Sequence, residues 1–281
     1  MLLSMSVVSC STFDIRGLVM PTGDDVEERF GQSMKINHDL KAEAVYAEKD
    51  YTFYVATDPH VMDTYNNVSV FNDTFRNDRD ASFGVMLGDY TGTRDNLHMY
   101  LDAVAYDPQK HSHDHRLFHV LGNHDLFYNG WVDFRDNLGA SVYWFEVLFD
   151  GGKDLFITLD TASGTLGRNQ TKWLKSFIDS ERNHYRHCVI LTHTNFFYTD
   201  NSQLSSGNMP LEECFSLIDL FGRYDVSLVL QGHDHHREDV VYDNVRYSVT
   251  GTMQDGSKAP EFLIVTAKED GLSLEWNLIL D

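Results

Sequence analysis

The sequence predicts an α/β fold in which strands and helices alternate as parallel crossover units. Short apolar runs that are rich in aromatic and β-branched residues alternate with amphipathic stretches over most of the 281 residues. Several of these runs end in glycine and polar side chains, which is typical of the strand ends where α/β sheets bind ligands. With 42% hydrophobic residues, the chain favours one large domain of about 250 residues over two small ones.

Residues 1–49 differ in kind from the rest of the chain. Residues 1–10 are apolar and rich in small residues, and they resemble the end of a bacterial lipoprotein signal, in which Cys10 would be lipidated. The positive n-region is missing and the apolar run is short, so an ordinary first strand is the alternative. Residues 11–49 are expected to form a tether or clasp, with a helix near 39–48, before a main domain at 50–281.

Composition restricts the partners and the compartment. Lys and Arg number 22 against 43 Asp and Glu, for a formal net charge of -21 without any basic block, which argues against a non-specific nucleic-acid binder. After the first segment no run approaches the ~20 apolar residues of a membrane span. A lipid on Cys10 would place the protein, exported, at the bacterial cell envelope; otherwise we expect it in the cytoplasm. Cys188 and Cys214 are expected to be core thiols.

The first half of the chain predicts three strands that each end in a polar block. The strands and blocks are residues 51–57 before Asp58-Pro59-His60, 83–87 before Gly88-Asp89, and 117–121 before Gly122-Asn123-His124-Asp125. Helices are expected at 68–79 and 96–105. Because the carboxyl ends of parallel strands meet at one edge, these polar blocks should lie together at one edge of one sheet.

The second half repeats this pattern. Strands 143–149 and 154–159 flank Asp150-Gly151-Gly152, a hairpin signal. The further expected elements are helix 170–178, strand 189–191 before His193, a substrate-side loop at 194–209, a helix from about 210, and strand 226–230 before Gly232-His233-Asp234-His235-His236. The β-rich segments 245–249, 261–266 and 272–280 are expected to finish a second sheet.

The polar blocks contain carboxylates, an amide and imidazoles but no cysteine. Such mixed oxygen and nitrogen ligands suit Mn, Fe, Co, Ni or Zn and do not suit a structural thiolate zinc. The candidate ligands are Asp58, His60, Asp89, Asn123, His193, His233 and His235. They are enough for two metal ions with a bridging carboxylate, and a pair of ions ~3.5–4 Å apart can activate water and clamp the oxygens of a phosphoryl displacement.

Taken in order, these blocks resemble the signature of the calcineurin-like metallophosphoesterases. The resemblance runs from Tyr51 to about His236 and implies a four-layered α/β/β/α sandwich of two mixed sheets flanked by helices. It also implies a dinuclear metal-dependent phosphoric ester hydrolase, which attacks a phosphomonoester or phosphodiester with a metal-bridging hydroxide. The expected partner is a small phosphate-ester substrate, and the identity of the two metal ions stays open among those named above.

The resemblance also implies a role for each candidate residue. Asp58, His60 and His235 would hold one metal, while Asn123, His193 and His233 would hold the other, with Asp89 bridging. His124 would stabilise the phosphoryl transition state or protonate the leaving oxygen, and Asp125 would orient His124. Because Asn123 is neutral, two dications opposed by two carboxylates leave surplus positive charge for a phosphate.

The chain departs from the family pattern after Asp89. Many members have a second aspartate three residues later, often with an arginine beyond, whereas here Tyr90-Thr91-Gly92 follows. This argues against the protein phosphatase branch, although Arg94 and Asp95 are candidates to replace the missing contacts.

Other polar and aromatic residues near the blocks carry weaker expectations. Asp234 is expected to brace a histidine ligand from behind. The expected substrate contacts are Tyr128, Asn195 and Phe196, with Trp131, Phe197 and Tyr198 as further candidates. A second histidine cluster at His111, His113, His115 and His119 is interpreted as a solvated loop rather than a metal site.

Two other functions remain open from the sequence. A binding or scaffold protein that kept the fold and lost catalysis would show gaps among the ligands or the acid, and no gap is visible. A nuclease or a pyrophosphatase could use the same centre, but the acidic composition speaks against a nuclease.

Overall fold

The computed structural model describes residues 25–91, 96–104, 117–197 and 208–280. Residues 1–24, with Cys10 and the lipoprotein-like segment, lie outside this part of the chain. Within it the strands are β1 (Val45–Tyr46), β2 (Tyr51–Ala56), β3 (Ala81–Met86), β4 (Leu117–His119), β5 (Tyr143–Phe149), β6 (Gly152–Thr158), β7 (Cys188–Leu191), β8 (Leu228–Gln231), β9 (Glu238–Tyr242), β10 (Val245–Val249), β11 (Glu261–Lys268) and β12 (Gly271–Leu278). The α-helices are α2 (Val26–Ile36), α3 (Asn66–Asn77), α4 (Leu97–Ala103), α5 (Trp131–Leu138), α6 (Gly167–Glu181) and α7 (Leu211–Arg223), with 3-10 turns η1 (His38–Leu40), η3 (His124–Asn129) and η4 (Arg182–His184).

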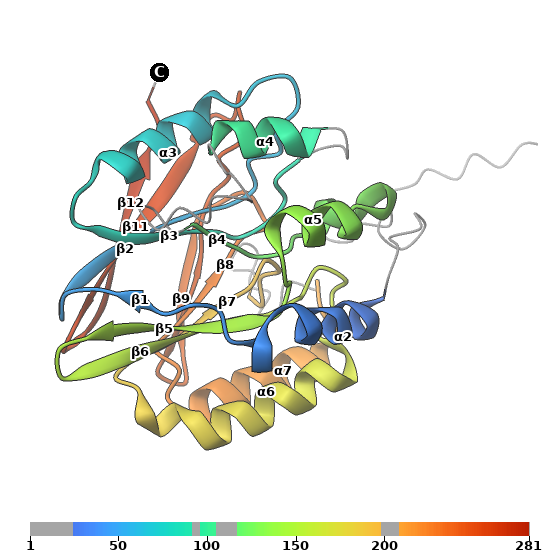
Figure 1. Ribbon diagram of the computed structural model, residues 1–281. Coiled ribbons are helices and arrows are strands. Elements are labelled where there is room, and N and C mark those ends of the chain that lie inside the picture. The colour runs from blue at the N-terminus through green and yellow to red at the C-terminus, as the bar shows by residue number, and fades with distance from the viewer. Residues whose placement is uncertain (1–24, 92–95, 105–116, 198–207, 281) are drawn as a thin grey trace, which may run out of the picture.

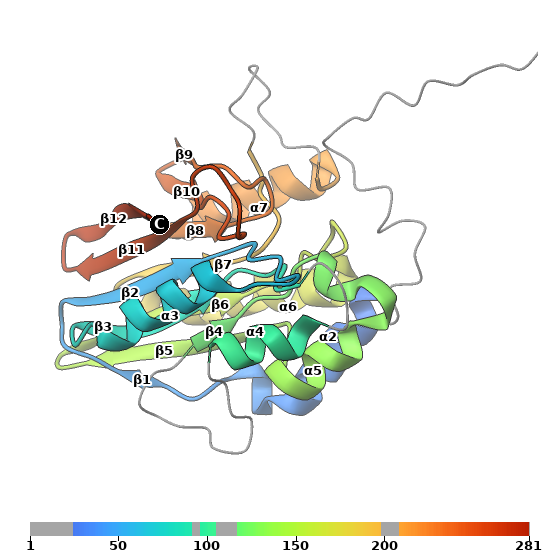
Figure 2. The ribbon, with the colours of Figure 1, turned by 90° about the horizontal axis from the view of Figure 1, so that it is seen from above.

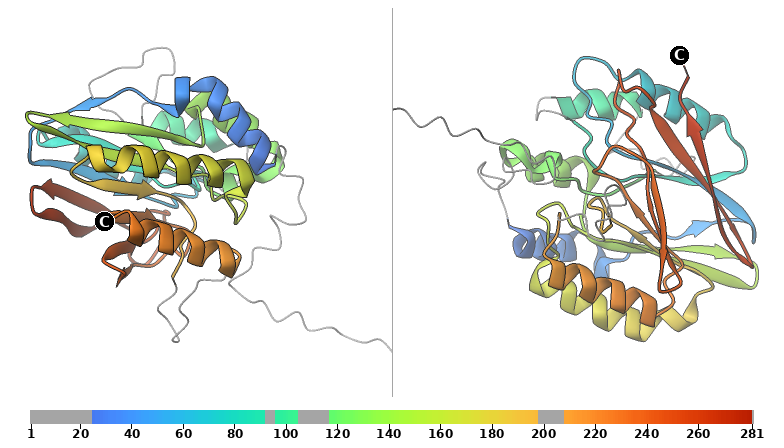
Figure 3. Two further views of the ribbon diagram at one scale, coloured as in Figure 1. Left: turned by 90° about the horizontal axis from the view of Figure 1, so that it is seen from below. Right: turned by 180° about the vertical axis from the view of Figure 1, so that it is seen from behind.

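Two mixed sheets lie face to face between layers of helices, which confirms the four-layered sandwich. One sheet has the order β1-β5-β6-β7-β8-β10-β9 and the other the order β12-β11-β2-β3-β4. In Figure 1, α3 and α4 lie above the five-stranded sheet, while α6 and α7 lie below the seven-stranded sheet. Figure 2 shows the same arrangement from above, and Figure 3 shows α6 and α7 side by side along the outer face.

The core between the two sheets is built from aromatic side chains. Phe53 and Phe83 of the five-stranded sheet stack on each other, with ring centroids 4.8 Å apart. Both rings meet the edge of Phe156 from the seven-stranded sheet, at 5.3 and 5.2 Å. Separate apolar clusters join each sheet to its outer helices. Because each strand of this kind buries both faces, its sequence is a continuous apolar run.

The strands that carry the polar blocks are parallel. β2, β3 and β4 pair in parallel, and so do β6, β7 and β8. Their carboxyl ends therefore meet at one edge of each sheet, and the two edges face each other across the sandwich. This register positions the candidate site.

Two sequence-based expectations about the elements are wrong. The N-terminal helix is α2 rather than residues 39–48, because Asp25 and Glu28 form a capping box at its start. The last two strands do not complete the second sheet: β11 pairs antiparallel with β2, so β11 and β12 extend the five-stranded sheet. Helix α5 was not expected at all.

Residues 25–49, part of the segment expected to form a tether or clasp, contact the rest of the domain. Arg29 is fully buried and binds the buried Asp160 through Nε and Nη2, at 2.8 and 3.0 Å. β1 adds a parallel edge to the seven-stranded sheet by pairing with β5. Among the described residues, none of the helices has the length and apolarity to cross a membrane. Cys188 and Cys214 are buried free thiols, as expected.

Candidate metal centre

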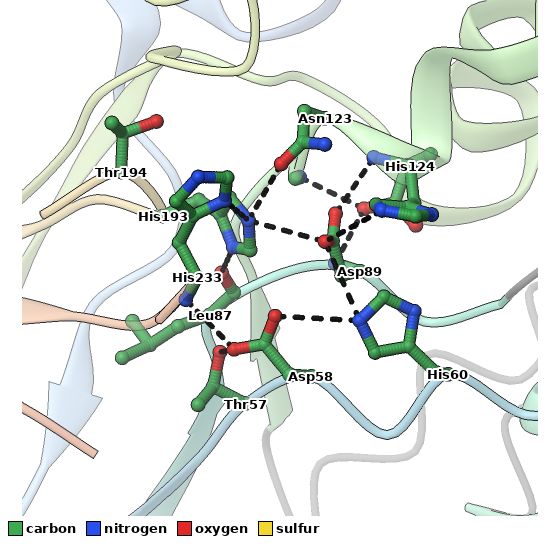
Figure 4. A network of polar contacts seen from close by, with 12 residues as sticks. Thr57, Asp58, His60, Leu87, Asp89, Asn123, His124, His193, Thr194 and His233 are labelled. Atoms are coloured by element: carbon green, nitrogen blue, oxygen red, sulfur yellow. Dashed lines mark hydrogen bonds and ion pairs between the residues drawn. The ribbon is translucent and has the colours of Figure 1, made fainter. Parts of the chain in front are cut away.

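The structure brings all seven candidate ligands together at the facing edges of the two sheets. Asp58 and His60 follow β2, Asp89 follows β3, and Asn123 follows β4, while His193 follows β7 and His233 and His235 follow β8. Figure 4 shows the labelled side chains of this group pointing toward one another. The sequence-based prediction that the polar blocks of the first half share one sheet edge is confirmed.

Five of the seven candidate ligands have a left-handed backbone. Their φ angles are 51° for Asp58, 40° for His60, 56° for Asp89, 79° for His233 and 59° for His235. Residues other than glycine adopt this region rarely and at an energetic cost, so such backbones persist where the surrounding structure imposes them. Because these left-handed residues lie close together, we infer that the surrounding structure imposes a backbone conformation that directs their side chains toward the centre.

Glycines next to the ligands leave the room that this convergence needs. A Cβ atom on Gly122 would lie 2.2 Å from Oδ1 of Asp89, and one on Gly232 would lie 2.1 Å from Oγ1 of Thr57. Neither distance is sterically tolerable. These two glycines therefore allow neighbouring strand ends to approach within contact.

The first donor group consists of Asp58, His60 and His235. Oδ1 of Asp58 lies 3.3 Å from Nε2 of His235 and 3.6 Å from Nε2 of His60, and the two Nε2 atoms are 3.0 Å apart. Oδ1 of Asp58 is buried and has no hydrogen-bond partner among the residues that the structure describes. Since a buried carboxylate oxygen without a partner is costly, this geometry fits a cation held by the three side chains.

The other oxygen of Asp58 is occupied. Oδ2 accepts hydrogen bonds from Oγ1 of Thr57 at 2.6 Å and from the backbone N–H of His233 at 2.8 Å. These two bonds orient the carboxylate so that Oδ1 faces the imidazoles. The sequence had not indicated a role for Thr57, because a threonine before the aspartate carries no ligand signal of its own.

The second donor group surrounds His193. Its Nε2 lies 3.1 Å from Oδ1 of Asn123, 3.2 Å from Nδ1 of His233 and 3.3 Å from Oδ2 of Asp89. Its Nδ1 donates to the backbone carbonyl of Leu87 at 2.7 Å. Because a carbonyl only accepts, Nδ1 carries a proton, and Nε2 is the atom that can take a proton or a cation at the centre.

Asp89 belongs to both groups. Its Oδ2 faces Nε2 of His193 at 3.3 Å, Nε2 of His60 at 3.6 Å and Nε2 of His124 at 4.0 Å. Its Oδ1 accepts the backbone N–H of His124 at 2.8 Å. One carboxylate oxygen placed between imidazoles from both groups has the position that a bridging ligand requires.

The electrostatics of the site favour positive charge between the two carboxylates. Burial alone would raise the pKa of Asp89, but His193, His124 and His60 together hold it well below its usual value. Burial alone would lower the pKa of His193. The charges of Asp89 and Asp58 outweigh this effect and raise the pKa to about 10. The two buried aspartates thus stabilise a positive group beside His193, which is the environment that a bound cation needs.

His124 occupies a different position from the ligands. Its side chain is 30% exposed, and its ring stands edge-on to that of His60 with centroids 4.6 Å apart. The ring of Phe127 also packs against His124, with ring centroids 4.5 Å apart. A partly accessible imidazole beside Asp89 can reach a molecule that enters the centre.

Asp125, expected to orient His124, binds backbone N–H groups next to His124 rather than its imidazole. Oδ2 of Asp125 accepts the backbone N–H groups of Asp89 and Gly122 at 2.9 and 2.8 Å, and Oδ1 accepts that of Tyr90 at 2.8 Å. The carboxylate therefore ties the end of β3 to the end of β4. Its pKa is raised to about 7, mainly by burial and by the charge of Asp89.

The structure corrects most of the expected substrate contacts. Phe196 is buried in the core against Phe221 and Tyr247. Asn195 is fully buried and bonds the backbone carbonyl of Phe197. Neither side chain is accessible to a substrate. Trp131 and Phe197 are also buried, whereas Tyr128 on η3 is 52% exposed and stays a prediction.

Asp234 does not brace a histidine ligand. Its Oδ2 accepts a hydrogen bond from Nδ2 of Asn195 instead, and Oδ1 of Asn195 accepts one from Nδ2 of Asn208 at 2.7 Å. These contacts connect Asn195, which follows β7, with Asp234, which follows β8. Arg94, Asp95 and Tyr198 lie outside the described residues.

His119 is a core residue and not part of a solvated loop. It lies on β4, its Nε2 is 2.9 Å from the hydroxyl of Tyr100, and burial lowers its pKa to about 3. The neighbouring His111, His113 and His115 lie outside the part of the chain that the structure describes.

Comparisons with solved structures agree with this architecture. GAP50, described as the anchor in the inner membrane complex of Plasmodium, aligns with a TM-score of 0.59 and 14% identity over 82% of this chain and 84% of its own. A putative 5'-nucleotidase from Staphylococcus aureus aligns with a TM-score of 0.55 and 17% identity over 83% of this chain. The alignment spans only 55% of the nucleotidase chain. At these identities the likeness concerns the fold alone.

Comparison with sequences identifies the family. No curated protein matches the chain significantly. The family model for calcineurin-like phosphoesterases matches residues 51–237, a range that contains every strand end of the candidate metal centre. The chain therefore belongs to the calcineurin-like phosphoesterase family.

Proposed function

We propose that the protein is a metal-dependent phosphoesterase that hydrolyses a phosphomonoester or a phosphodiester at a two-cation centre. One observation carries this proposal: Oδ2 of Asp89 faces imidazoles from two donor groups, at 3.3 Å from His193 and 3.6 Å from His60. A second supports it, since Oδ1 of Asp58 is buried with no hydrogen-bond partner in the described part of the chain. Both observations fit bound cations better than an ordinary polar core, because buried polar groups in a core form hydrogen bonds with each other.

The side chains divide into two sets of ligands. Asp58, His60 and His235 would hold one cation, Asn123, His193 and His233 would hold the other, and Asp89 would touch both. The donor chemistry suits Mn, Fe, Zn, Co or Ni. Two bound cations of this kind supply an activated water and neutralise phosphate oxygens. The chain's own contribution is to hold the ligands rigidly through the contacts of Thr57, Leu87 and Asp125.

His124 is positioned to act on the substrate. Its backbone N–H is fixed by Oδ1 of Asp89 at 2.8 Å, while its ring is partly exposed beside His60 and Phe127. From there it can donate a hydrogen bond to a phosphate oxygen or a proton to the leaving oxygen. Asp125 supports this indirectly, because it holds the turn from which His124 projects.

A non-catalytic binding protein is the second candidate. The fold is shared with a structure described as an anchor, so the architecture alone does not require catalysis. All seven ligand positions and His124 are present in this chain, however, whereas a protein that had lost catalysis would be expected to show gaps among them. A nuclease remains the less favoured use of the centre because of the net charge of -21.

Metal counting combined with turnover tests the proposal. The purified protein is dialysed against Mn, Fe, Co, Ni or Zn, and its metal content and its hydrolysis of p-nitrophenyl phosphate and bis(p-nitrophenyl) phosphate are measured. We expect two ions per chain and turnover of at least one ester. Asp89→Asn should lose both the second ion and the turnover, whereas Asp73→Asn, on the exposed face of α3, should lose neither. Two bound ions without turnover of a broad ester and pyrophosphate panel would favour the binding protein.

We also propose export and a lipid anchor at Cys10, on the evidence of the sequence of residues 1–10. An envelope location would favour nutrient phosphate esters, nucleotides or lipid-linked pyrophosphates as substrates. Labelling of the full chain with a fatty acid in a bacterial host, with Cys10→Ala as the control, tests this. Unlabelled protein found only in the cytoplasm would contradict it.

A further inference from the structure

The connection between β10 and β11 crosses from one sheet to the other beside the metal centre. It lies beyond residues 51–237, which match the family. The backbone N–H of Thr250 donates to the carbonyl of Gln231 at 3.0 Å, at the end of β8, and that of Met253 donates to the carbonyl of Thr57 at 3.0 Å, at the end of β2. This connection therefore ties together the two strand ends that precede His235 and Asp58.

Thr252 in this connection holds the backbone of Asp58. Its side chain is buried, and its Oγ1 donates to the carbonyl oxygen of Asp58 at 2.6 Å. Asp58 has a φ of 51°, a conformation that residues other than glycine adopt rarely and that surrounding contacts stabilise. Because the backbone conformation decides where the carboxylate points, the hydroxyl of Thr252 helps to direct Oδ1 of Asp58 toward His60 and His235.

Asp255 holds the other end of the same segment. Its Oδ2 accepts the hydroxyl of Thr64 at 2.5 Å and the backbone N–H of Asn66 at 2.9 Å, and its Oδ1 accepts the backbone N–H of Asn67 at 2.9 Å. It thereby caps α3, whose own N-cap residue, Tyr65, makes no side-chain capping bond. Residues 58–65 are thus anchored by Thr252 at their start and by Asp255 at their end.

Most of the other donor group depends on different contacts, and only His233 is linked to Asp58, because its backbone N–H donates to Oδ2 of Asp58 at 2.8 Å. His193 is oriented by the carbonyl of Leu87, and Asp89 by the backbone N–H of His124. Neither contact involves residues 250–256. A change at Thr252 or Asp255 should therefore affect one donor group more than the other.

We propose that Thr252 and Asp255 are positioning residues that set the affinity of the Asp58, His60 and His235 group for a divalent cation. This inference rests on the proposed function, since it requires that the centre binds metal. It assigns a functional role to a segment outside the family match. Neither residue touches the cation; each acts through the backbone that carries Asp58 and His60.

The test compares cation binding in four versions of the full chain. Metal-free wild type, Thr252→Val and Thr252→Ser are titrated with Mn²⁺ by calorimetry, and His235→Ala identifies the binding step of the first donor group. We expect Thr252→Val to weaken that step by about 10- to 100-fold, the usual effect of losing a contact behind a metal ligand, and to leave the other step unchanged. Thr252→Ser, which keeps the hydroxyl, should bind as wild type does.

Two further variants make the result decisive. Thr158→Val removes a buried hydroxyl that has no hydrogen-bond partner among the described residues and should leave both steps unchanged. Asp255→Ala should weaken Mn²⁺ binding at the first donor group, as Thr252→Val does. If circular dichroism shows that Thr252→Val does not fold, the result for Asp255→Ala tests the inference by itself.

Equal weakening of both steps, or wild-type affinities in both variants, would overturn the inference while the proposed function stands. If the wild type binds no cation, the proposed function fails and the inference fails with it.

Discussion

Replacing Arg29 by methionine should destabilise the whole domain. The guanidinium is fully buried and makes two bonds to Asp160, at 2.8 and 3.0 Å, and one to Oγ of Ser163 at 2.9 Å. In Arg29→Met, Asp160 would remain buried, and within the described residues its carboxylate would keep only the hydroxyl of Ser141 and the N–H of Ala162 as hydrogen-bond donors. Removing one partner of a buried ion pair costs about 3–5 kcal/mol, because the other charge is left uncompensated.

Urea unfolding followed by tryptophan fluorescence measures this loss. Arg76→Met, at an exposed position of α3, is the matched control and should change the free energy of unfolding by less than about 0.5 kcal/mol. The double variant Arg29→Met with Asp160→Asn should lose less than the sum of the two single variants, since no buried charge remains. If Arg29→Met lowered the free energy of unfolding by less than about 1 kcal/mol, or if the losses of the two single variants simply added in the double variant, the reasoning would be refuted. The buried pair of Arg29 and Asp160 would then not be what fastens α2 to the domain.

Three further changes test the site and the stability of the fold. His124→Ala should keep two bound ions but lower kcat by about 10²- to 10⁴-fold, the scale of a lost general acid; a fall to one ion would make His124 a ligand. Gly122→Ala would force a Cβ to within 2.2 Å of Oδ1 of Asp89 and should reduce metal content, whereas Gly31→Ala in α2, with nothing within 4 Å, should not. The pKa of Glu146 is lowered to about 2, because hydrogen bonds from two lysines and a tyrosine outweigh its burial. Its contribution to stability is therefore present above its usual pKa of 4.5 and lost as the pH falls toward 2, so the difference in urea midpoint between wild type and Glu146→Gln should shrink over that range.

Local sequence signals were sufficient to predict the strand ends in the first half of the chain. The run before Gly122 is apolar and short, and the residues after it are polar, so the position of Asn123 and His124 at a strand end follows from nearest neighbours along the chain. Parallel crossover units then bring successive strand ends to one edge. For this reason the convergence of Asp58, Asp89 and Asn123 was predictable before any coordinates.

Contacts between distant segments were not predictable in this way. β11 could have paired in either sheet, because its run of apolar residues specifies a buried strand and not its neighbour. Likewise, the side chain of Phe196 follows a site block in sequence but turns into the core, since the chain after His193 bends toward α7.

The sequence by itself determined the fold class, the set of metal-binding side chains and the strand ends that present them, because these depend on periodicity and on residue type. Only the tertiary structure decided what holds those side chains in place. Asp125 supports the backbone around Asp89 and Gly122 rather than the imidazole of His124, and Thr252 supports Asp58 from 194 residues away. Such hydrogen bonds join a side chain of one segment to the backbone of another that it meets only after folding, so no pattern along the chain encodes them.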